Sequence, residues 1–310
     1  MKAIVYDRYA GLAGMALRDL PAPEPAAGHV VVRVRAAGVN PVDIAVAQGE
    51  LQQMFPPAFP AIAGSELSGV IAATASDVAD WAVGDAVHAL LGVSGAFAEY
   101  ALVPASILVR KPALMSFAQA AGLPVAAATA TAALDRGEVG PGTRVLIHAA
   151  AGGVGTVLVQ MAKARGAHVT ALASTANLDY VAQLGADVVV DRLGSAWRDV
   201  RDIDVVIDGF GPPAQDISWK MLRPNGMLLS LVTQPSPEQA ADHGVRAHRI
   251  FGNRDPGILR RANDWFEAGQ LVPQIERRFA LDEAIEALRL IERGSPRGKI
   301  ILDIAEADAT

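Results

Sequence analysis

The residues best suited to chemistry form a glycine-rich turn within Arg144–Gly155, which reads R-V-L-I-H-A-A-A-G-G-V-G. A strand pattern precedes the turn and a helix pattern follows it, as in a nucleotide-binding βαβ unit. Gly152 allows the backbone to approach a pyrophosphate, Gly155 allows the helix to pack closely on the strand, and the helix N-terminus attracts the anion. The turn residues expected to meet the phosphates are Ala151, Gly152, Gly153 and Val154. Ala150 replaces the first glycine of the usual GxGxxG motif, and a tight turn without a ligand is the alternative.

The second strand pattern of this unit, His168–Ala173, bears on which dinucleotide binds. An NAD site places Asp or Glu at the end of this strand, where the carboxylate holds the ribose hydroxyls. Here the next carboxylate along the chain is Asp179, and the polar residues before it are Ser174, Thr175 and Asn177. Short hydroxyl and amide groups donate to a 2′-phosphate, and Arg192, after the third strand, supplies a cation. We therefore predict NADP(H), with capping of the next helix as the alternative role for the three polar residues.

The elements that position this turn alternate between strand and helix from about residue 122 onward. Continuous Val, Ile and Leu strands separated by helices predict a parallel sheet covered on both faces. The expected strands are Arg144–His148, His168–Ala173, Asp187–Asp191, Asp204–Phe210, Gly226–Val232 and Arg246–Gly252. The expected helices are Gly153–Arg165, Ala176–Leu184 and Pro212–Leu222.

The two ends of the chain have a different pattern. The first 120 residues carry short strand patterns broken by Pro and Gly, which predict a β-barrel or sandwich. These strands are Lys2–Tyr6, His29–Ala37, Ser68–Ala73 and Ala98–Val103. The last 50 residues predict helices and strands in alternation, at Pro256–Ala268, Gln274–Ala280, Leu281–Glu292 and Lys299–Ile304. We expect them to return to the first domain, because the parallel sheet is already complete.

The composition limits the class of protein. The chain has 310 residues, of which 51% are hydrophobic, a net charge of −6 and no cysteine. Its length suggests two domains, and the absence of cysteine excludes disulfides, Cys-ligated metal sites and a thiol nucleophile. Without a run of 18 apolar residues or a signal-peptide core, we expect no membrane span and a cytoplasmic location. The sequence has no basic patch interleaved with aromatic residues, so nucleic acid is not an expected partner.

Nine short motifs in order resemble the zinc-independent quinone oxidoreductase (zeta-crystallin-like) group of the medium-chain dehydrogenases/reductases. They are A-G-V-N-P-V-D (37–43), G-S-E-L-S-G-V (64–70), G-D-A-V (84–87), G-A-F-A-E-Y (95–100), A-G-L-P-V-A-A-A-T (121–129), H-A-A-A-G-G-V-G (148–155), L-G-A-D (184–187), L-R-P-N-G (222–226) and R-G-K-I (297–300). The resemblance covers nearly the whole chain and implies an α/β fold with a GroES-like β-rich catalytic domain and a Rossmann doubly wound parallel sheet. The implied boundaries are 1–121 for the catalytic domain, 122–261 for the NADP-binding domain and 262–310 for the C-terminal return to the catalytic domain. The resemblance also implies a homodimer paired through the last Rossmann strand, whose edge must be covered or paired.

The same resemblance implies residues near the nicotinamide. Thr129 matches a family threonine at that end of the cofactor, and Asn40 matches the family asparagine on the acceptor side. Residues after the fifth and sixth Rossmann strands are implied to line the same region, namely Leu231, Val232, Phe251 and Asn253. Asn40 also suits the N-cap of a short helix with Asp43 at its third position. Tyr100 is a candidate proton donor, with a packed tyrosine as the alternative, and Lys299 is either a surface lysine or a site residue.

Zinc-dependent members of the superfamily use Cys and His ligands that this sequence lacks. Their G-H-E motif reads Gly64-Ser65-Glu66 here, and the six histidines show no i, i+4 pair, so we predict no metal site. Without zinc to polarise a carbonyl, hydride transfer stays easy only to an activated acceptor. We therefore predict NADPH-dependent reduction of a quinone or an α,β-unsaturated carbonyl. The alternatives are an enoyl-thioester reductase and a low-turnover NADPH-binding sensor or structural protein.

Overall fold

The computed structural model describes residues 1–54, 56, 58–294 and 296–304. Its internal contacts divide the chain into two units that interleave along the sequence. The first unit consists of Met1–Val125, Arg254–Glu267 and Pro273–Thr310, and the second of Ala126–Asn253 and Ala268–Val272. Each unit has its own sheet and its own buried core.

The first unit is built on a sheet of seven strands with the order β15-β16-β3-β5-β6-β8, in which β7 also pairs with β3. Its strands are β3 (His29–Val39), β5 (Glu66–Thr74), β6 (Ala86–Leu90), β7 (Tyr100–Pro104), β8 (Val109–Arg110), β15 (Ile275–Ala280) and β16 (Lys299–Asp303). A smaller sheet has the order β2-β1-β4, formed by β1 (Lys2–Tyr6), β2 (Ala16–Asp19) and β4 (Ala61–Ile62). Val30, Val32 and Val34 enter the core together, because alternate side chains of a strand share one face.

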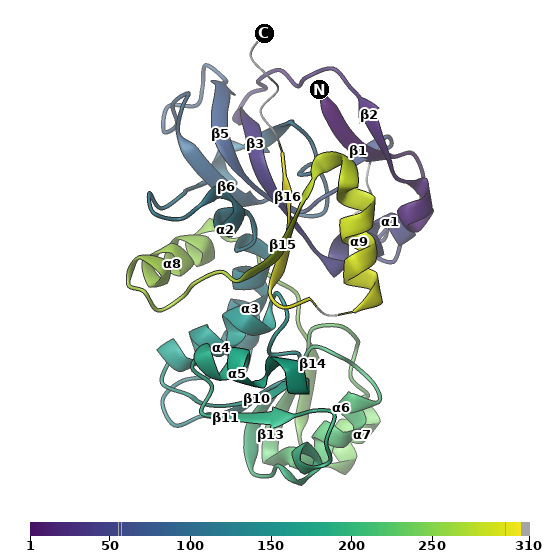
Figure 1. The fold of residues 1–310 in the computed structure, drawn as a ribbon, viewed down its shortest axis with the longest axis vertical. Coiled ribbons are helices and arrows are strands. Elements are labelled where there is room, and N and C mark those ends of the chain that lie inside the picture. The colour runs from purple at the N-terminus through teal and green to yellow at the C-terminus, as the bar shows by residue number, and fades with distance from the viewer. Residues whose placement is uncertain (55, 57, 295, 305–310) are drawn as a thin grey trace. The chain divides into compact units, whose positions relative to one another are not determined.

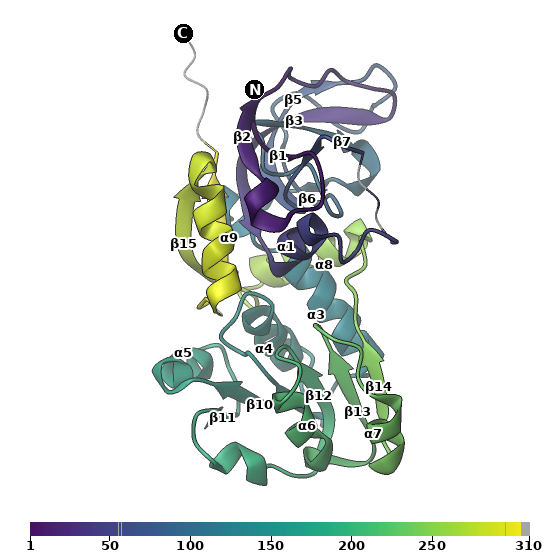
Figure 2. The same ribbon diagram turned by 90° about the vertical axis from the view of Figure 1, so that its right-hand side faces the viewer.

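The C-terminal strands return to this first sheet. β16 pairs antiparallel with β3, with Ile300 opposite Val39, so Lys299 lies beside the end of β3. The helices of the first unit are α1 (Pro41–Gln48), α2 (Phe117–Ala121), α8 (Pro256–Glu267) and α9 (Ala284–Arg293). Figures 1 and 2 both show α9 alongside α1 and β16, although these segments are far apart in the sequence.

The second unit is a sheet of six parallel strands with the order β11-β10-β9-β12-β13-β14. The strands are β9 (Arg144–Ile147), β10 (His168–Ala173), β11 (Val188–Asp191), β12 (Ile203–Asp208), β13 (Leu222–Ser230) and β14 (Arg246–Arg249). The chain moves outward from β9 in two directions, and right-handed crossovers therefore place the helices on opposite faces. In Figure 2, α4 (Gly155–Ala164) and α5 (Leu178–Gln183) lie on one face, and α6 (Ala214–Ser218) and α7 (Pro237–Asp242) on the other. The remaining helix, α3 (Pro124–Arg136), begins with two residues of the first unit.

The predicted fold class is confirmed. The predicted elements differ at their ends, and others, such as α3, α7 and β6, were not predicted. β14 ends at Arg249 rather than at Gly252, so the residues that follow belong to a loop. The helix expected over Pro212–Leu222 is shorter, because α6 passes into a 3₁₀ turn at Trp219–Met221. The helix expected from Ala176 begins at Leu178 instead, after a 3₁₀ turn at Thr175–Asn177. The other 3₁₀ turns are Gly11–Gly14, Ala105–Ile107, Ala196–Asp199 and Leu281–Glu283.

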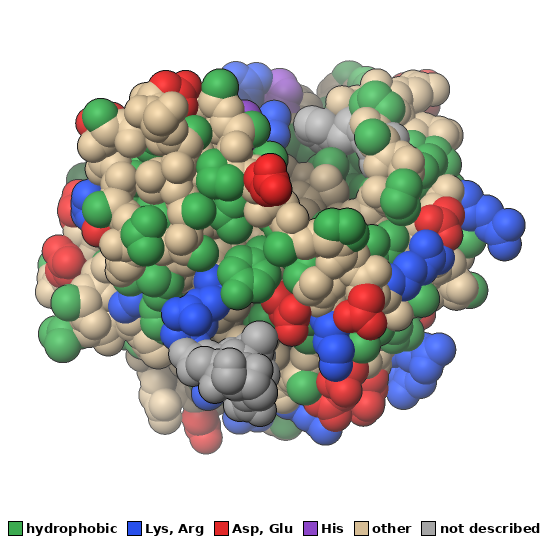
Figure 3. All heavy atoms as spheres, turned by 90° about the horizontal axis from the view of Figure 1, so that it is seen from above, with side chains coloured by type: hydrophobic (Ala, Val, Ile, Leu, Met, Phe, Trp, Pro, Cys, Tyr) green, Lys and Arg blue, Asp and Glu red, His purple; other side chains and the backbone are tan. Residues whose placement is uncertain are grey.

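The surface carries charges of both signs. On the face drawn in Figure 3, acidic and basic side chains lie interspersed among hydrophobic ones. This agrees with the modest net charge of −6. None of the helices that the structure describes is both long enough and apolar enough to cross a lipid bilayer.

Candidate active site

Most of the predicted cofactor residues follow strands at one edge of the parallel sheet. Ala173 at the end of β10 lies opposite Asp191 at the end of β11, and Asp208 of β12 lies opposite Ser230 of β13. The carboxyl ends of parallel strands share one edge, where such sheets bind ligands. The residues gathered there are Ala151, Gly152, Gly153 and Val154 after β9, Ser174, Thr175 and Asn177 after β10, Arg192 after β11, Leu231 and Val232 after β13, and Phe251 and Asn253 after β14.

The glycine turn after β9 requires at least one of its glycines. Ala149 turns the chain at a φ of 51°, and its carbonyl oxygen accepts a hydrogen bond from the Gly152 amide at 2.9 Å. A Cβ atom on Gly155 would lie 2.1 Å from the Ala149 oxygen, so only glycine lets α4 begin this close to the strand. The first turn of a helix leaves backbone amides without intrahelical acceptors. The turn is therefore suited to bind a pyrophosphate although Ala150 departs from the motif.

The turn after β10 contains the polar groups predicted to meet the ribose end of the cofactor. The Asn177 side-chain amide donates to Ser174 Oγ at 3.2 Å. The Thr175 hydroxyl donates to Asp191 Oδ2 at 2.5 Å. The guanidinium of Arg192 lies over the Phe210 ring, 5.2 Å from its centre. The structure thus brings the four predicted residues together. It also adds the carboxylate of Asp191, which the sequence analysis did not include.

Three of the predicted nicotinamide residues, Thr129, Phe251 and Asn253, lie on α3 and in the loop after β14. Thr129, on α3, approaches the loop after β14, where a Cβ atom on Gly252 would lie 3.2 Å from Thr129 Oγ1. Thr129 is therefore close to the segment that contains Phe251 and Asn253. The Phe251 side chain is 52% exposed, and the Arg249 guanidinium lies 4.7 Å from the centre of its ring.

Asp208 was missed by sequence analysis and organises the loop after β13. Its fully buried carboxylate accepts hydrogen bonds from the amides of Phe210 and Gly211 and from the Ser230 hydroxyl, at 2.9 to 3.1 Å. The Asp208 carbonyl accepts from the Leu231 amide at 2.8 Å. A buried carboxylate that accepts this many hydrogen bonds fixes the segments that donate them. The sequence signal that could have identified Asp208 was an acidic residue directly after the apolar residues of a strand pattern.

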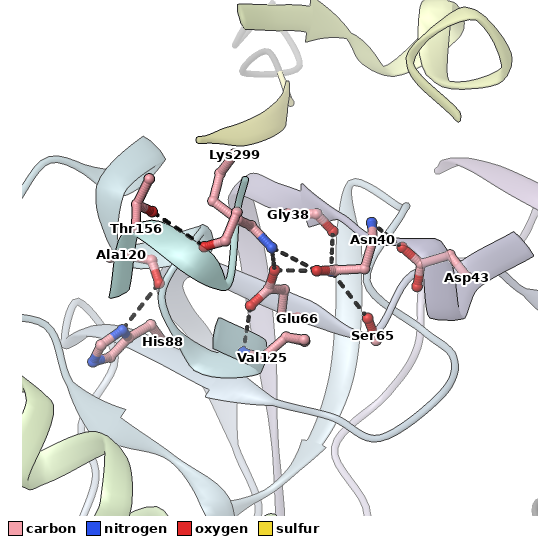
Figure 4. A network of polar contacts seen from close by, with 11 residues as sticks. Gly38, Asn40, Asp43, Ser65, Glu66, His88, Ala120, Val125, Thr156 and Lys299 are labelled. Carbon is pink, nitrogen blue, oxygen red and sulfur yellow. Dashed lines mark hydrogen bonds and ion pairs between the residues drawn. The ribbon is translucent and has the colours of Figure 1, made fainter. Parts of the chain in front are cut away.

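A buried ion pair lies in the first unit, where Lys299 contacts Glu66 (Figure 4). Lys299 Nζ donates to Glu66 Oε1 at 2.7 Å and to Asn40 Oδ1 at 2.5 Å. Glu66 Oε2 accepts from the Val125 amide in the first turn of α3 at 2.7 Å. Lys299 is 4% exposed and Glu66 is fully buried. Lys299 is therefore not a surface lysine, and an acid within an apolar strand motif was the signal that a buried cation faces it.

Asn40 is the member of this cluster that was predicted to act on the acceptor side. Its amide nitrogen donates to Glu66 Oε1 at 2.9 Å and to the Gly38 carbonyl at 3.2 Å. These bonds use both amide hydrogens, and the carbonyl oxygen is held by Lys299. Asn40 also occupies the N-cap of α1, as its alternative role predicted, and its backbone amide donates to Asp43 Oδ2 at 2.8 Å. The side chain of Asn40 therefore has one fixed orientation.

Asp43 lies in the same buried region and is 3% exposed. Burial raises the pKa of Asp43 to about 7, against the opposing effect of the Asn40 amide. The Glu66 carboxylate raises this pKa further, and Lys299 lowers it. A buried carboxyl with a raised pKa gains a proton more readily in the folded chain than in the unfolded one.

Tyr100 lies elsewhere in the first unit. It begins β7 and pairs with Arg33 of β3, seven residues before Asn40 in the sequence. At about 3.3 Å per strand residue, this separates Tyr100 from Asn40 by on the order of 20 Å. Tyr100 lines a cavity of about 270 Å³ with residues that include Ile62, Leu91 and Leu102. The structure therefore does not bring the two predicted catalytic side chains together.

We expect Lys299→Met to lower the free energy of unfolding by about 3–5 kcal/mol, because Glu66 would remain buried without its cation. Urea unfolding followed by circular dichroism measures this change. The matched control is Arg278→Met, which removes the exposed Arg278–Asp303 ion pair and should cost less than about 1 kcal/mol. Equal losses in the two variants would contradict a stabilising role for the buried pair.

We expect Asp43→Asn to make unfolding less dependent on pH. A carboxyl with a folded pKa near 7 stabilises the fold below its unfolded pKa of 3.8, and this contribution is lost as the pH rises through 7. Between pH 5 and pH 8, the free energy of unfolding should therefore shift in favour of the variant by at least about 1 kcal/mol. Asp19→Asn, an exposed change of the same charge, is the control. A difference between wild type and variant that is constant with pH would show that Asp43 does not titrate in this range.

Comparison with known proteins places the chain in a family. Residues 26–113 match the alcohol dehydrogenase GroES-like domain, and residues 184–302 match the zinc-binding dehydrogenase family. The chloroplastic NADPH-dependent alkenal/one oxidoreductase of Arabidopsis thaliana is 32% identical over 97% of this chain and 79% of its own length. A chloroplastic quinone oxidoreductase of Triphysaria versicolor is 30% identical over 98% of both chains. The quinone oxidoreductase structure from Coxiella burnetii has a TM-score of 0.88, is 30% identical and covers 98% of this chain and 99% of its own.

The second matching family is named for zinc, and the Cys and His ligands usual for that metal are absent or sparse in this sequence. The sequence has no cysteine, and the described residues contain no group of three His, Asp or Glu that could hold an ion. His88 is hydrogen-bonded with the Ala120 carbonyl and with Asn263, and His148 with the Ser218 hydroxyl. Burial lowers the pKa of each histidine to about 4, so both are neutral packing residues.

The matches extend over both units and nearly the whole chain. They agree with the GroES-like sheet of the first unit and the parallel Rossmann sheet of the second. The chain therefore belongs to the medium-chain dehydrogenase/reductase superfamily and is an oxidoreductase related to its quinone and alkenal/one oxidoreductases.

Proposed function

We propose that this oxidoreductase transfers hydride from NADPH, without zinc, to a quinone or an α,β-unsaturated carbonyl compound. The observation that carries the proposal is the glycine turn after β9 together with the turn Ser174–Asn177 after β10, at one edge of the parallel sheet. A pyrophosphate at the first turn places the adenosine ribose near the second. The Arabidopsis relative is named as NADPH-dependent and as acting on alkenals and alkenones, and the Triphysaria relative is named as a quinone oxidoreductase.

The residues have separate roles in this proposal. Ala151, Gly152, Gly153 and Val154 bind the pyrophosphate, and Ser174, Thr175, Asn177 and Arg192 bind the ribose end. Thr129, Leu231, Val232, Phe251 and Asn253 line the nicotinamide. Asn40 is the polar group on the acceptor side, and its fixed amide keeps that region polar without adding a free charge. Tyr100 stays a predicted proton donor.

Two arguments support the proposed zinc independence, namely the donor groups available in the chain and the chemistry of the acceptor. The chain has no thiolate, and its buried histidines are engaged with protein partners. Quinones and enones spread the developing negative charge over a conjugated system, so a metal is not needed to stabilise it. The protein must hold the cofactor and the acceptor in the correct orientation, and this accounts for most of the catalysis.

We also propose a homodimer. β14 forms one edge of the six-stranded sheet and, in the part of the chain that the structure describes, pairs only with β13. An open strand edge must be covered or paired, and a second copy of the chain would supply a partner of equal length. Light scattering at micromolar concentration distinguishes a dimer from a monomer.

We expect the purified protein, treated with EDTA, to oxidise NADPH in the presence of a benzoquinone or a 2-alkenal, and to use NADH more slowly. The decrease in absorbance at the wavelength of the reduced nicotinamide measures the rate. A reaction without acceptor and one with added zinc are the controls. Activity that disappears in EDTA and returns with zinc would refute metal independence. Tight NADPH binding with no turnover of either acceptor would favour the sensor alternative.

A further inference from the structure

A carboxylate, that of Asp191, lies beside the turn after β10, which is the ribose end of the proposed cofactor site. The register of the parallel strands sets Asp191 directly opposite Ala173, the residue that precedes Ser174. The Arg192 amide then donates to the Ala173 carbonyl at 2.8 Å. The end of β11 and the turn after β10 are therefore joined by backbone and side-chain contacts. Any group bound by Ser174 and Thr175 lies next to the Asp191 carboxylate.

Asp191 is held in place and ionised. Its Oδ1 accepts from the Leu193 amide at 2.9 Å, and its Oδ2 accepts from the Thr175 hydroxyl at 2.5 Å. The Thr175 hydrogen bond, followed by that of Leu193, lowers the pKa of Asp191 below its usual value. The carboxylate is therefore negatively charged at neutral pH, and two fixed donors keep it beside the turn.

The same hydrogen bond changes what Thr175 can do. A hydroxyl has one hydrogen, and that of Thr175 is donated to Asp191. In this arrangement Thr175 presents only lone pairs to a ligand, so it cannot donate to a phosphate oxygen. Of the short polar groups predicted to bind a 2′-phosphate, one is thus occupied by the neighbouring acid.

The positive charge near this site is also partly engaged. Arg192 lies over the Phe210 ring at 5.2 Å, in the geometry of a cation–π contact. Arg192 and Asp191 are adjacent in the chain and have opposite charges, so their fields at the turn oppose each other. The carboxylate of Asp191 therefore offsets part of the positive charge with which Arg192 would attract a 2′-phosphate.

Resting on the proposed use of a nicotinamide dinucleotide at this edge, we propose that Asp191 determines cofactor specificity by weakening NADPH relative to NADH. Its carboxylate repels the 2′-phosphate of NADPH and accepts a hydrogen bond from the 2′-hydroxyl of NADH. The wild-type protein then uses both cofactors, with a preference for NADPH smaller than Ser174, Asn177 and Arg192 alone would give.

The test is the Asp191→Asn variant, which removes the charge and keeps an acceptor oxygen. Dissociation constants for NADPH and NADH, measured by calorimetry without acceptor, give the preference of each protein. A unit charge about 4 Å away in water changes affinity by about fivefold, so the preference for NADPH should rise by at least about fivefold. Asp191→Ser, which keeps a shorter oxygen acceptor for the Leu193 amide, provides a second variant if the first does not fold.

The matched control is Asp242→Asn, which removes the same charge from an exposed position in α7, between the strands β13 and β14 at the opposite side of the sheet. A rise in preference in both Asp191 variants but not in the control supports the proposal. An unchanged preference in the Asp191 variants, with both cofactors bound by wild type, overturns it and leaves the proposed function standing. A wild-type protein that binds neither cofactor refutes the proposed function and this inference together.

Discussion

The buried carboxylate of Glu66 is the contact on which the first unit most depends. It joins the ammonium of Lys299 on the last strand, the amide of Asn40 after β3 and the backbone amide of Val125 in α3. These groups come from distant parts of the sequence; Glu66, Lys299 and Asn40 are buried, and Val125 is partly buried. An isolated buried charge costs several kcal/mol, so each group is tolerated only because the others are present. A Cβ atom on Gly38 would lie 2.1 Å from Glu66 Oε1, so even the backbone leaves space for this carboxylate.

The second unit depends on a different constraint, the alignment of its parallel strands. Because their carboxyl ends meet at one edge, residues far apart in the sequence become neighbours there. Asp208 and Asp191 are each the last residue of a strand, but they differ in burial and in their hydrogen-bond partners. Asp208 is buried and accepts bonds from surrounding loops, which fixes the backbone of the site. Asp191 is partly exposed and lies beside the turn after β10, where, in our proposal, its charge affects which cofactor binds.

Local features of the site were predictable from sequence, and contacts across the fold were not. The glycine turn is local, since Gly155 and Ala149, which approach each other closely, are only six positions apart in the sequence. The burial of Lys299 depends on Glu66, which is 233 residues away. The residues next to Lys299 in the sequence therefore could not distinguish a buried lysine from a surface lysine. Asp191 was missed for a related reason. The residues that follow Ala173 in the chain contain no acid before Asp179, whereas the register of β10 with β11 brings Asp191 beside Ala173 from the neighbouring strand.

Glu66 and Asp191 show how a carboxylate serves stability in one place and, in our proposal, cofactor selectivity in another. Glu66 is fully buried and paired, so replacing it alone would strand a charge and lower stability strongly. Asp191 lies at a strand end beside a loop, where water replaces most of what a substitution removes. A change at Asp191 therefore strands no fully buried charge, while it removes a negative charge from beside the turn after β10. If Asp191 sets cofactor preference as we propose, that preference can change without disturbing the buried Glu66 cluster, because the two carboxylates share no hydrogen-bond partner.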